Sequence, residues 1–133
     1  MRIRSTMTLN VITIAPDDSI KEAYEIMKEF DFRHIPVVEG TSLLGILSER
    51  DILMHSSYEE KKLLVPEIPA YEVMTTDVIT CSPKSTVADA AAAMVDHKIG
   101  CLPVIENKEI VGLVTSTDLL DILCQWKSGF ERH

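Results

Sequence analysis

Residues 45–51 read GILSERD, and residues 112–118 read GLVTSTD. Both stretches consist of a glycine, two apolar residues, a hydroxyl residue, two variable residues and an aspartate. Outward from them, a shift of 67 residues aligns the chain with itself without a gap. About 14 of the roughly 47 positions from 7 to 53 are identical to their partners, which chance rarely produces. The chain therefore contains two copies of one unit, and we expect repeat 1 at 1–56, a connector at 57–73 and repeat 2 at 74–133.

Each copy has the same order of predicted elements. A short β-rich run at 11–14 is followed by apolar residues at helical spacing from 20 to 30. The Ser19–Glu22 pair before that helix has the spacing of a capping box. Two dense apolar runs joined by a polar turn, 35–38 and 43–47, then predict a hairpin, and a second helix is expected at about 49–55. The same elements recur 67 residues later, where the last helix extends to about residue 126.

The pattern predicts an α+β fold of tandem strand–helix–strand–strand–helix repeats. A unit of about 50 residues is marginal by itself, and a small sheet needs cover on its open face. We therefore expect the repeats to pack sheet to sheet about a pseudo-two-fold axis as one cooperative unit. A fragment ending near Tyr58 should be unfolded.

Composition restricts the classes of function. The chain has 133 residues, 46% of them apolar, and a formal net charge of −8. Such a negative field repels nucleic acids and anionic membranes, so neither is an expected partner. We predict no membrane span and no export signal, and the three cysteines, without a C-x-x-C pair, suit the reducing cytoplasm. The cysteines are expected to be small buried apolar residues.

The two end motifs support two interpretations. Ser48 with Asp51, and Thr115 with Asp118, have the spacing of plain helix capping. The same geometry suits a ligand, because helix amides and hydroxyls bind phosphate and a carboxylate accepts from both hydroxyls of a ribose. A glycine has no side chain, so it leaves room on each strand where a ligand or another strand approaches closely.

The chain resembles the CBS domain pair, or Bateman module, named after cystathionine β-synthase. The resemblance covers about residues 1 to 125 and rests on motifs that occur in order, twice: Met-Thr at the head, Thr-x-x-Pro, Ile/Leu-Pro-Val in the middle and the end motif. It implies a free-standing regulatory module that binds AMP, ADP, ATP, S-adenosylmethionine or NAD(H) in two clefts between the repeats. No obligatory cofactor is implied. By analogy, the chain forms a homodimer and signals to an effector protein not identified by the sequence.

The resemblance also assigns residues to each cleft. In the family the aspartate holds the ribose hydroxyls, and the hydroxyl residues before it face ribose and phosphate. The first cleft would use Thr13, Ile14, Phe32, Arg33, His34, Thr115, Thr117 and Asp118. The second would use Ser48, Arg50, Asp51, Thr80, Cys81, Ile99, Gly100 and Cys101. Arg33 and His34 supply cations that favour the first cleft for a phosphate chain.

The alternative function is a protein-protein interaction or dimerisation module with no bound nucleotide. Trp126 either packs within the protomer or marks a dimer contact. We do not expect an enzyme, because the sequence has no Ser/His/acid set and no Walker-type loop. The histidines lack ligand spacing, so we expect no metal site.

Overall fold

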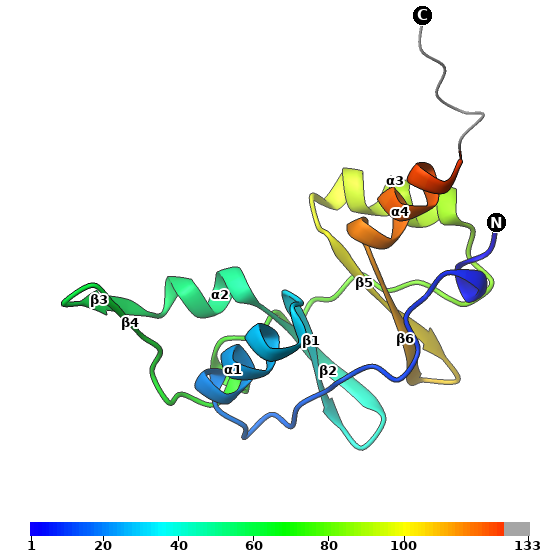
Figure 1. Ribbon diagram of the computed structural model, residues 1–133. Coiled ribbons are helices and arrows are strands. Elements are labelled where there is room, and N and C mark those ends of the chain that lie inside the picture. The colour runs from blue at the N-terminus through cyan, green and yellow to red at the C-terminus, as the bar shows by residue number, and fades with distance from the viewer. Residues whose placement is uncertain (127–133) are drawn as a thin grey trace, which may run out of the picture. The chain divides into compact units, whose positions relative to one another are not determined.

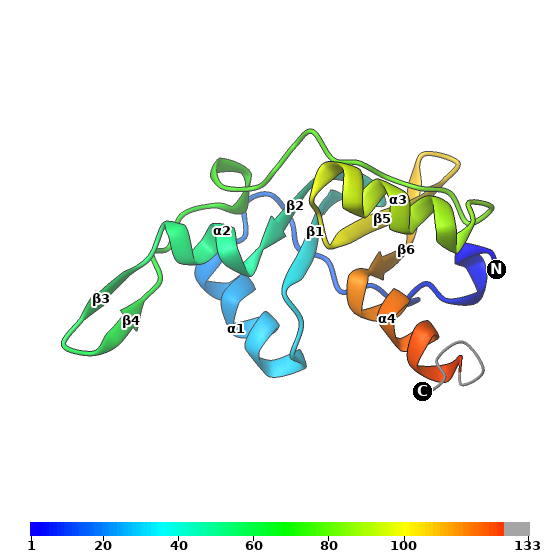
Figure 2. The ribbon, with the colours of Figure 1, turned by 90° about the horizontal axis from the view of Figure 1, so that it is seen from above.

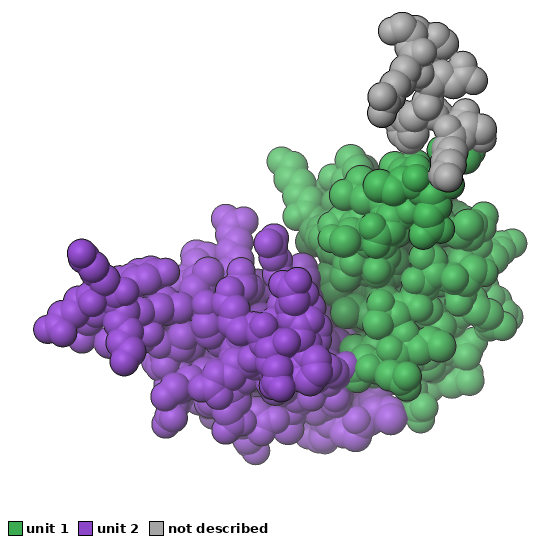
Figure 3. All heavy atoms as spheres, viewed as in Figure 1, with its two compact units in different colours: residues 1–11, 79–133 green, residues 12–78 purple. Residues whose placement is uncertain are grey.

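The computed structural model describes residues 1–126, and the chain divides into two units (Figure 3). Unit 2 contains residues 12–78, and unit 1 combines residues 1–11 with the chain from residue 79 onward. The boundaries of each unit thus differ from those of the predicted repeats, because residues 1–11 belong to the unit that contains most of repeat 2. Residues 127–133, the end of predicted repeat 2, lie outside the described residues.

Unit 2 is built on one antiparallel hairpin with two helices. Its elements are α1 (Ile20–Phe30), β1 (His34–Glu39), β2 (Ser42–Ser48), α2 (Glu49–Met54), β3 (Ser57–Glu59), β4 (Lys62–Leu64) and the 3-10 helix η2 (Ala70–Glu72). The two helices lie on the same side of the β1–β2 hairpin (Figures 1 and 2). Their apolar sides enclose a core with fully buried Ile20, Met27, Ile35 and Leu47.

Unit 1 repeats this arrangement. Its elements are the 3-10 helix η1 (Ile3–Ser5), α3 (Val87–His97), β5 (Cys101–Glu106), β6 (Glu109–Thr115) and α4 (Ser116–Gln125). The register agrees as well, because both hairpins carry an irregularity at matching places, Val37/Val38 and Val104/Ile105. The predicted α+β class and its tandem units are therefore confirmed.

The first predicted strand of each copy is much shorter than expected. Ile14 forms a single parallel bridge to Val37, and Cys81 forms one to Val104. Two backbone hydrogen bonds support the first bridge, from the Ile14 amide to Pro36 (3.0 Å) and from the Val38 amide to Ile14 (2.9 Å). Pro16 and Pro83, two residues beyond these bridges, limit any extension of the pairing toward the C-terminal side.

The Met-Thr segment that heads each sequence repeat packs in the unit formed mainly by the other repeat. In unit 2, the Thr75 and Ile46 backbones exchange two hydrogen bonds of 2.9 Å. In unit 1, Thr8 and Leu113 exchange bonds of 2.8 and 3.1 Å. Another segment of this chain therefore approaches Gly45 and Gly112 closely, as the sequence analysis expected of a ligand or another strand.

The glycines of the two hairpins should not tolerate alanine equally. A Cβ at position 45 would lie 2.7 Å from the Thr75 carbonyl oxygen, whereas at position 112 the nearest atom is the flexible Met7 sulfur at 2.8 Å. Because overpacking costs about 1–3 kcal/mol, we expect Gly45→Ala to lose about 3 kcal/mol of unfolding free energy and Gly112→Ala about 1 kcal/mol. Urea denaturation of both variants measures this, and equal losses would contradict it.

The predicted connector is structured. β3 and β4 form a hairpin with exposed Glu59, Glu60, Lys61 and Lys62, and it extends away from the helices of unit 2 (Figures 1 and 2). The sequence analysis predicted a connector at 57–73 without strands of its own. Beyond the hairpin, Ala70 is fully buried in the core of unit 2. No helix within residues 1–126 has the length and apolar character needed to cross a membrane.

Candidate functional site

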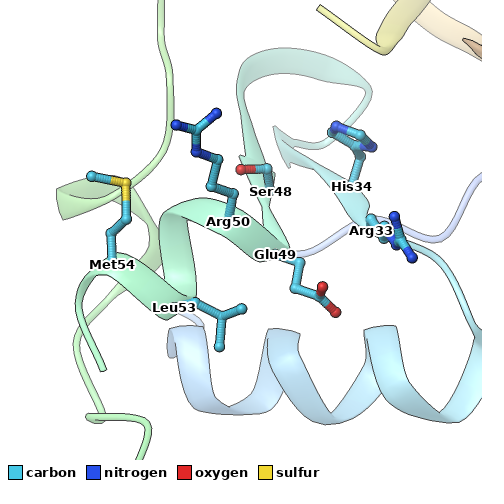
Figure 4. A pocket seen from close by; sticks show the side chains of 7 residues that line it. All are labelled: Arg33, His34, Ser48, Glu49, Arg50, Leu53 and Met54. Atoms are coloured by element: carbon cyan, nitrogen blue, oxygen red, sulfur yellow. The ribbon is translucent and has the colours of Figure 1, made fainter. Parts of the chain in front are cut away.

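A cavity of about 430 Å³ opens in unit 2 (Figure 4). It is lined by Arg33, His34, Ser48, Glu49, Arg50, Leu53 and Met54. Four of these residues were predicted as site residues, namely Arg33, His34, Ser48 and Arg50. Sequence analysis missed the other three, although Leu53 and Met54 follow Glu49 and Arg50 by one helical turn.

Strand pairing explains why these residues meet. His34 at the start of β1 lies opposite Ser48 at the end of β2. The Glu49 amide also donates to the Arg33 carbonyl at 2.8 Å, which ties the start of α2 to the residue before β1. The sequence analysis divided Arg33 and His34 from Ser48 and Arg50, assigning them to separate clefts. The structure places all four around one pocket.

The pocket carries an excess of cationic groups. Arg33 and Arg50 are exposed, so their guanidinium groups are available to a ligand. His34 is half-buried, and this burial lowers its pKa; Arg33 lowers it further, while the negative charge of Asp51 opposes both. An imidazole that is neutral in the free protein gains a proton readily when an anion arrives beside it.

The acidic residue of the pocket is already paired. Glu49 Oε2 lies 3.2 Å from Lys28 Nζ on α1, so its charge is neutralised from outside the pocket. Figure 4 shows the Glu49 side chain turned toward α1, whereas Arg50 points the other way. The unpaired charges at the pocket are therefore positive, which suits a phosphate or carboxylate.

The two end motifs differ in their hydrogen bonds. In α4 the Thr115 amide donates to the Asp118 carboxylate at 2.8 Å, and the Asp118 amide donates back to Thr115 Oγ1 at 3.2 Å. These two bonds form a reciprocal capping box, which agrees with the helix-capping interpretation of this motif. In α2 only the Asp51 amide donates to Ser48 Oγ (3.1 Å), and the return bond to the Asp51 carboxylate is missing.

The same distinction applies to the first helices. Thr86 and Asp89 form a reciprocal box at α3. At α1 only Ser19 accepts, from the Glu22 amide at 3.1 Å, so the predicted capping box is half formed.

The remaining predicted residues are divided between the units. Thr13, Ile14, Phe32 and Asp51 belong to unit 2, while Thr80, Cys81, Ile99, Gly100, Cys101, Thr115, Thr117 and Asp118 belong to unit 1. Within unit 1, Cys101 lies opposite Thr115, and the Ser116 amide donates to the Gly100 carbonyl at 2.9 Å. Each predicted cleft thus draws on residues of both units.

Burial disfavours the reactive thiolate form of Cys81 and Cys101. Burial raises the pKa of the Cys101 thiol to about 12, and the charges of Asp118 and Cys81 contribute. Burial also raises the pKa of Cys81. Cys124 is exposed, contrary to the expectation that all three would be buried, because α4 has no buried residue. Within residues 1–126, no three His, Cys, Asp or Glu side chains are placed to hold a metal ion.

Comparison of the repeats shows that the charged groups of the pocket belong to repeat 1 alone. At the matching positions of repeat 2, Arg33 is replaced by Gly100 and Arg50 by Thr117. His34 is likewise replaced by a cysteine, the residue 67 positions later. The two copies thus share a fold and differ in the chemistry that they offer.

Comparison with known proteins gives one consistent result. Residues 3–58 and 70–125 each match the CBS domain family. The chain is 34% identical to the CBS domain-containing protein YhcV of Bacillus subtilis, over 88% of this chain and 81% of that protein.

Similar solved structures include complexes with ligands. The CBS domain pair of protein MJ0100, in complex with 5′-methylthioadenosine and S-adenosylmethionine, has a TM-score of 0.81 and 26% identity, covering 95% of this chain and 98% of that one. CBSX2 in complex with AMP has a TM-score of 0.81 and 20% identity, covering 95% and 98%, and supports the fold alone.

Proposed function

The chain belongs to the CBS domain family and carries two CBS domains, and on that premise we propose that it is a regulatory module that binds an adenine nucleotide. Other CBS pairs bind AMP, S-adenosylmethionine and 5′-methylthioadenosine, which are all adenosine derivatives. The observation that carries the proposal for this chain is the pocket of unit 2, where Arg33, His34, Ser48 and Arg50 converge. No catalytic domain is part of the proposal.

The chemistry of the pocket favours a ligand with phosphate. Guanidinium groups bind phosphate through paired, charge-assisted hydrogen bonds, and Arg33 and Arg50 both reach the pocket. Ser48 Oγ accepts from the Asp51 amide, which leaves its hydroxyl proton for a ligand oxygen. S-adenosylmethionine carries a sulfonium cation and no phosphate. We therefore place AMP, ADP and ATP before it.

The ribose would be held by an end-motif aspartate, as in the family. Asp51 is the better candidate of the two, because its carboxylate is free of the capping bond that occupies one oxygen of Asp118. Asp51 does not line the pocket itself, but it directly follows the pocket residue Arg50 on α2, and its negative charge raises the pKa of His34. A ribose on Asp51 would thus lie beside the cations that take its phosphate.

Thermal denaturation with added ligand tests the proposal. A ligand at one hundred times its dissociation constant stabilises the folded protein by about 2.7 kcal/mol. We expect AMP, ADP or ATP to raise the melting temperature more than the phosphate-free S-adenosylmethionine or adenosine at equal concentration, and NADH, which carries phosphate, is tested alongside them. A melting temperature unchanged by all six compounds would reject nucleotide sensing.

A second candidate function is supported by α4. Leu120 on α4 is 59% exposed, and Trp126, the residue directly after α4, is 57% exposed. Apolar side chains exposed on one helix suit a protein partner, either an effector or a second copy in a homodimer. Sedimentation of the full chain distinguishes a homodimer from a monomer that awaits another protein.

A further inference from the structure

We propose that Lys28 is a positioning residue that holds Glu49 away from the arginines of the unit 2 pocket and so keeps them available to an anion. The inference rests on the proposed nucleotide binding at this pocket. Lys28 itself does not line the pocket, and it would act only through Glu49.

The geometry fixes Glu49 from the side of α1. Lys28 Nζ lies 3.2 Å from Glu49 Oε2 and 5.1 Å from the centre of the Tyr24 ring. The Glu49 side chain is only 23% exposed and also lines the pocket, so the direction open to it besides that of Lys28 is toward the pocket. The hydrogen bond with Glu49 raises the pKa of Lys28, so the ammonium group stays charged under the conditions of nucleotide binding.

Without Lys28, Glu49 would share the pocket lining with cations and have no partner of its own. Arg33 is the better placed of the two arginines, because the Glu49 amide is bonded to the Arg33 carbonyl, whereas adjacent residues of a helix such as Glu49 and Arg50 do not face each other. A carboxylate pairs well with a guanidinium group through two parallel hydrogen bonds. An unpaired Glu49 would therefore compete with phosphate for the same donors.

The distribution of these residues between the repeats supports the inference. Positions 24, 28 and 49 hold Tyr, Lys and Glu in repeat 1, and Ala91, Val95 and Ser116 stand at the matching places of repeat 2. Repeat 2 also lacks the two arginines. Lys28 thus occurs in the repeat that also has the glutamate and the two arginines, and the repeat without them has a valine in its place.

Stability alone does not explain the pair. The Lys28 side chain is 56% exposed, and an ion pair with one exposed partner contributes little to the folding free energy. The ion pair joins α1 to the start of α2, beside the pocket. Control of the Glu49 side chain explains this position better.

A double-mutant cycle tests the proposal, with AMP as the probe and calorimetric titration of the full chain as the measurement. We expect Lys28→Met to weaken AMP binding about tenfold and Lys28→Arg to retain most of the affinity. Glu49→Gln should strengthen binding far more in the Lys28→Met background than in the wild-type chain, because only there is the carboxylate released. Lys21→Met is the control, since Lys21 lies on the same helix and pairs with Glu67 at 3.9 Å, outside the pocket.

The outcomes separate this inference from the function on which it rests. Wild-type protein that binds AMP, together with equal affinities for the Lys28→Met and Lys21→Met variants, would overturn the role of Lys28 alone. Additive effects of the two substitutions would do the same, since they indicate only long-range charge. Wild-type protein that binds none of AMP, ADP and ATP would overturn the proposed function, and this inference with it.

Discussion

The double substitution Arg33→Ala/Arg50→Ala should weaken AMP binding at least a hundredfold. Each arginine can give phosphate a charge-assisted hydrogen bond worth about 1.5–3 kcal/mol, so the loss of both removes about 3 kcal/mol or more. Both side chains are exposed, and neither forms an ion pair within residues 1–126, so the fold should survive. Isothermal titration with AMP measures the loss of affinity, and thermal denaturation without ligand checks the fold.

A matched control removes the same charge elsewhere in unit 2. Lys61→Ala/Lys62→Ala also deletes two exposed cations, in the β3–β4 hairpin, where no residue lines the pocket. If the arginines act by direct contact, the lysine variant should bind AMP within about twofold of wild type. Similar losses in both variants would show that only the net charge of the chain matters, and the pocket would lose its role.

Adenosine separates phosphate recognition from binding of the base. The arginine variant should bind adenosine about as well as the wild type does, because the guanidinium groups are assigned to phosphate. A parallel loss of adenosine affinity would place the arginines against the base or ribose instead.

The sequence was sufficient to predict the helices and hairpins because their signals are local. Apolar spacing marked α1 at residues 20–30, where the structure has it, and the 67-residue offset carried the same result to α3. By contrast, tertiary packing determines which hairpin each Met-Thr segment joins. Met7-Thr8 and Met74-Thr75 are the same in sequence, so nothing local states which hairpin each one joins. Only Gly45 and Gly112 indicated that something would approach closely.

The candidate site was predictable in its residue types and not in its grouping. Arg33, His34 and Arg50 were assigned by the resemblance to the CBS domain pair, and all three line the pocket. Their grouping depends on the register of β1 with β2, which puts His34 opposite Ser48. The pairing of Glu49 with Lys28 joins two helices and leaves no signal in either helix taken alone.

The role of the end-motif aspartates also required the structure. Ser48-x-x-Asp51 and Thr115-x-x-Asp118 have one spacing, yet only the second forms both bonds of a capping box. Whether a carboxylate turns back to its cap or away from it depends on side-chain orientation. Spacing therefore left capping and ligand binding as alternatives. The two copies differ, because the Asp118 carboxylate bonds to its cap residue and the Asp51 carboxylate does not.

Removal of the segment after the β3–β4 hairpin should abolish folding of unit 2. Residues 65–74 include the fully buried Ala70, and Val65, Ile68, Val73 and Met74 pack against the same core. The segment also accepts a hydrogen bond from the Ile20 amide (2.9 Å) and donates one to Asp18 (2.8 Å). A domain is stable by only about 5–15 kcal/mol, so a loss on this scale leaves no folded state.

Fragments test this directly. By far-ultraviolet circular dichroism, we expect fragment 1–58 to be unfolded, and fragment 1–67 as well, because both lack the buried 3-10 helix at Ala70–Glu72. Fragment 12–78 has the same length as 1–67 and keeps every element of unit 2, so it should show more helix and a cooperative melting transition. The two fragments of equal length differ in which end of the chain they keep, and not in the β1–β2 hairpin or its helices. Equal helix content in both would therefore mean that the first repeat folds without the connector, and that the division of the chain into these two units has no energetic basis.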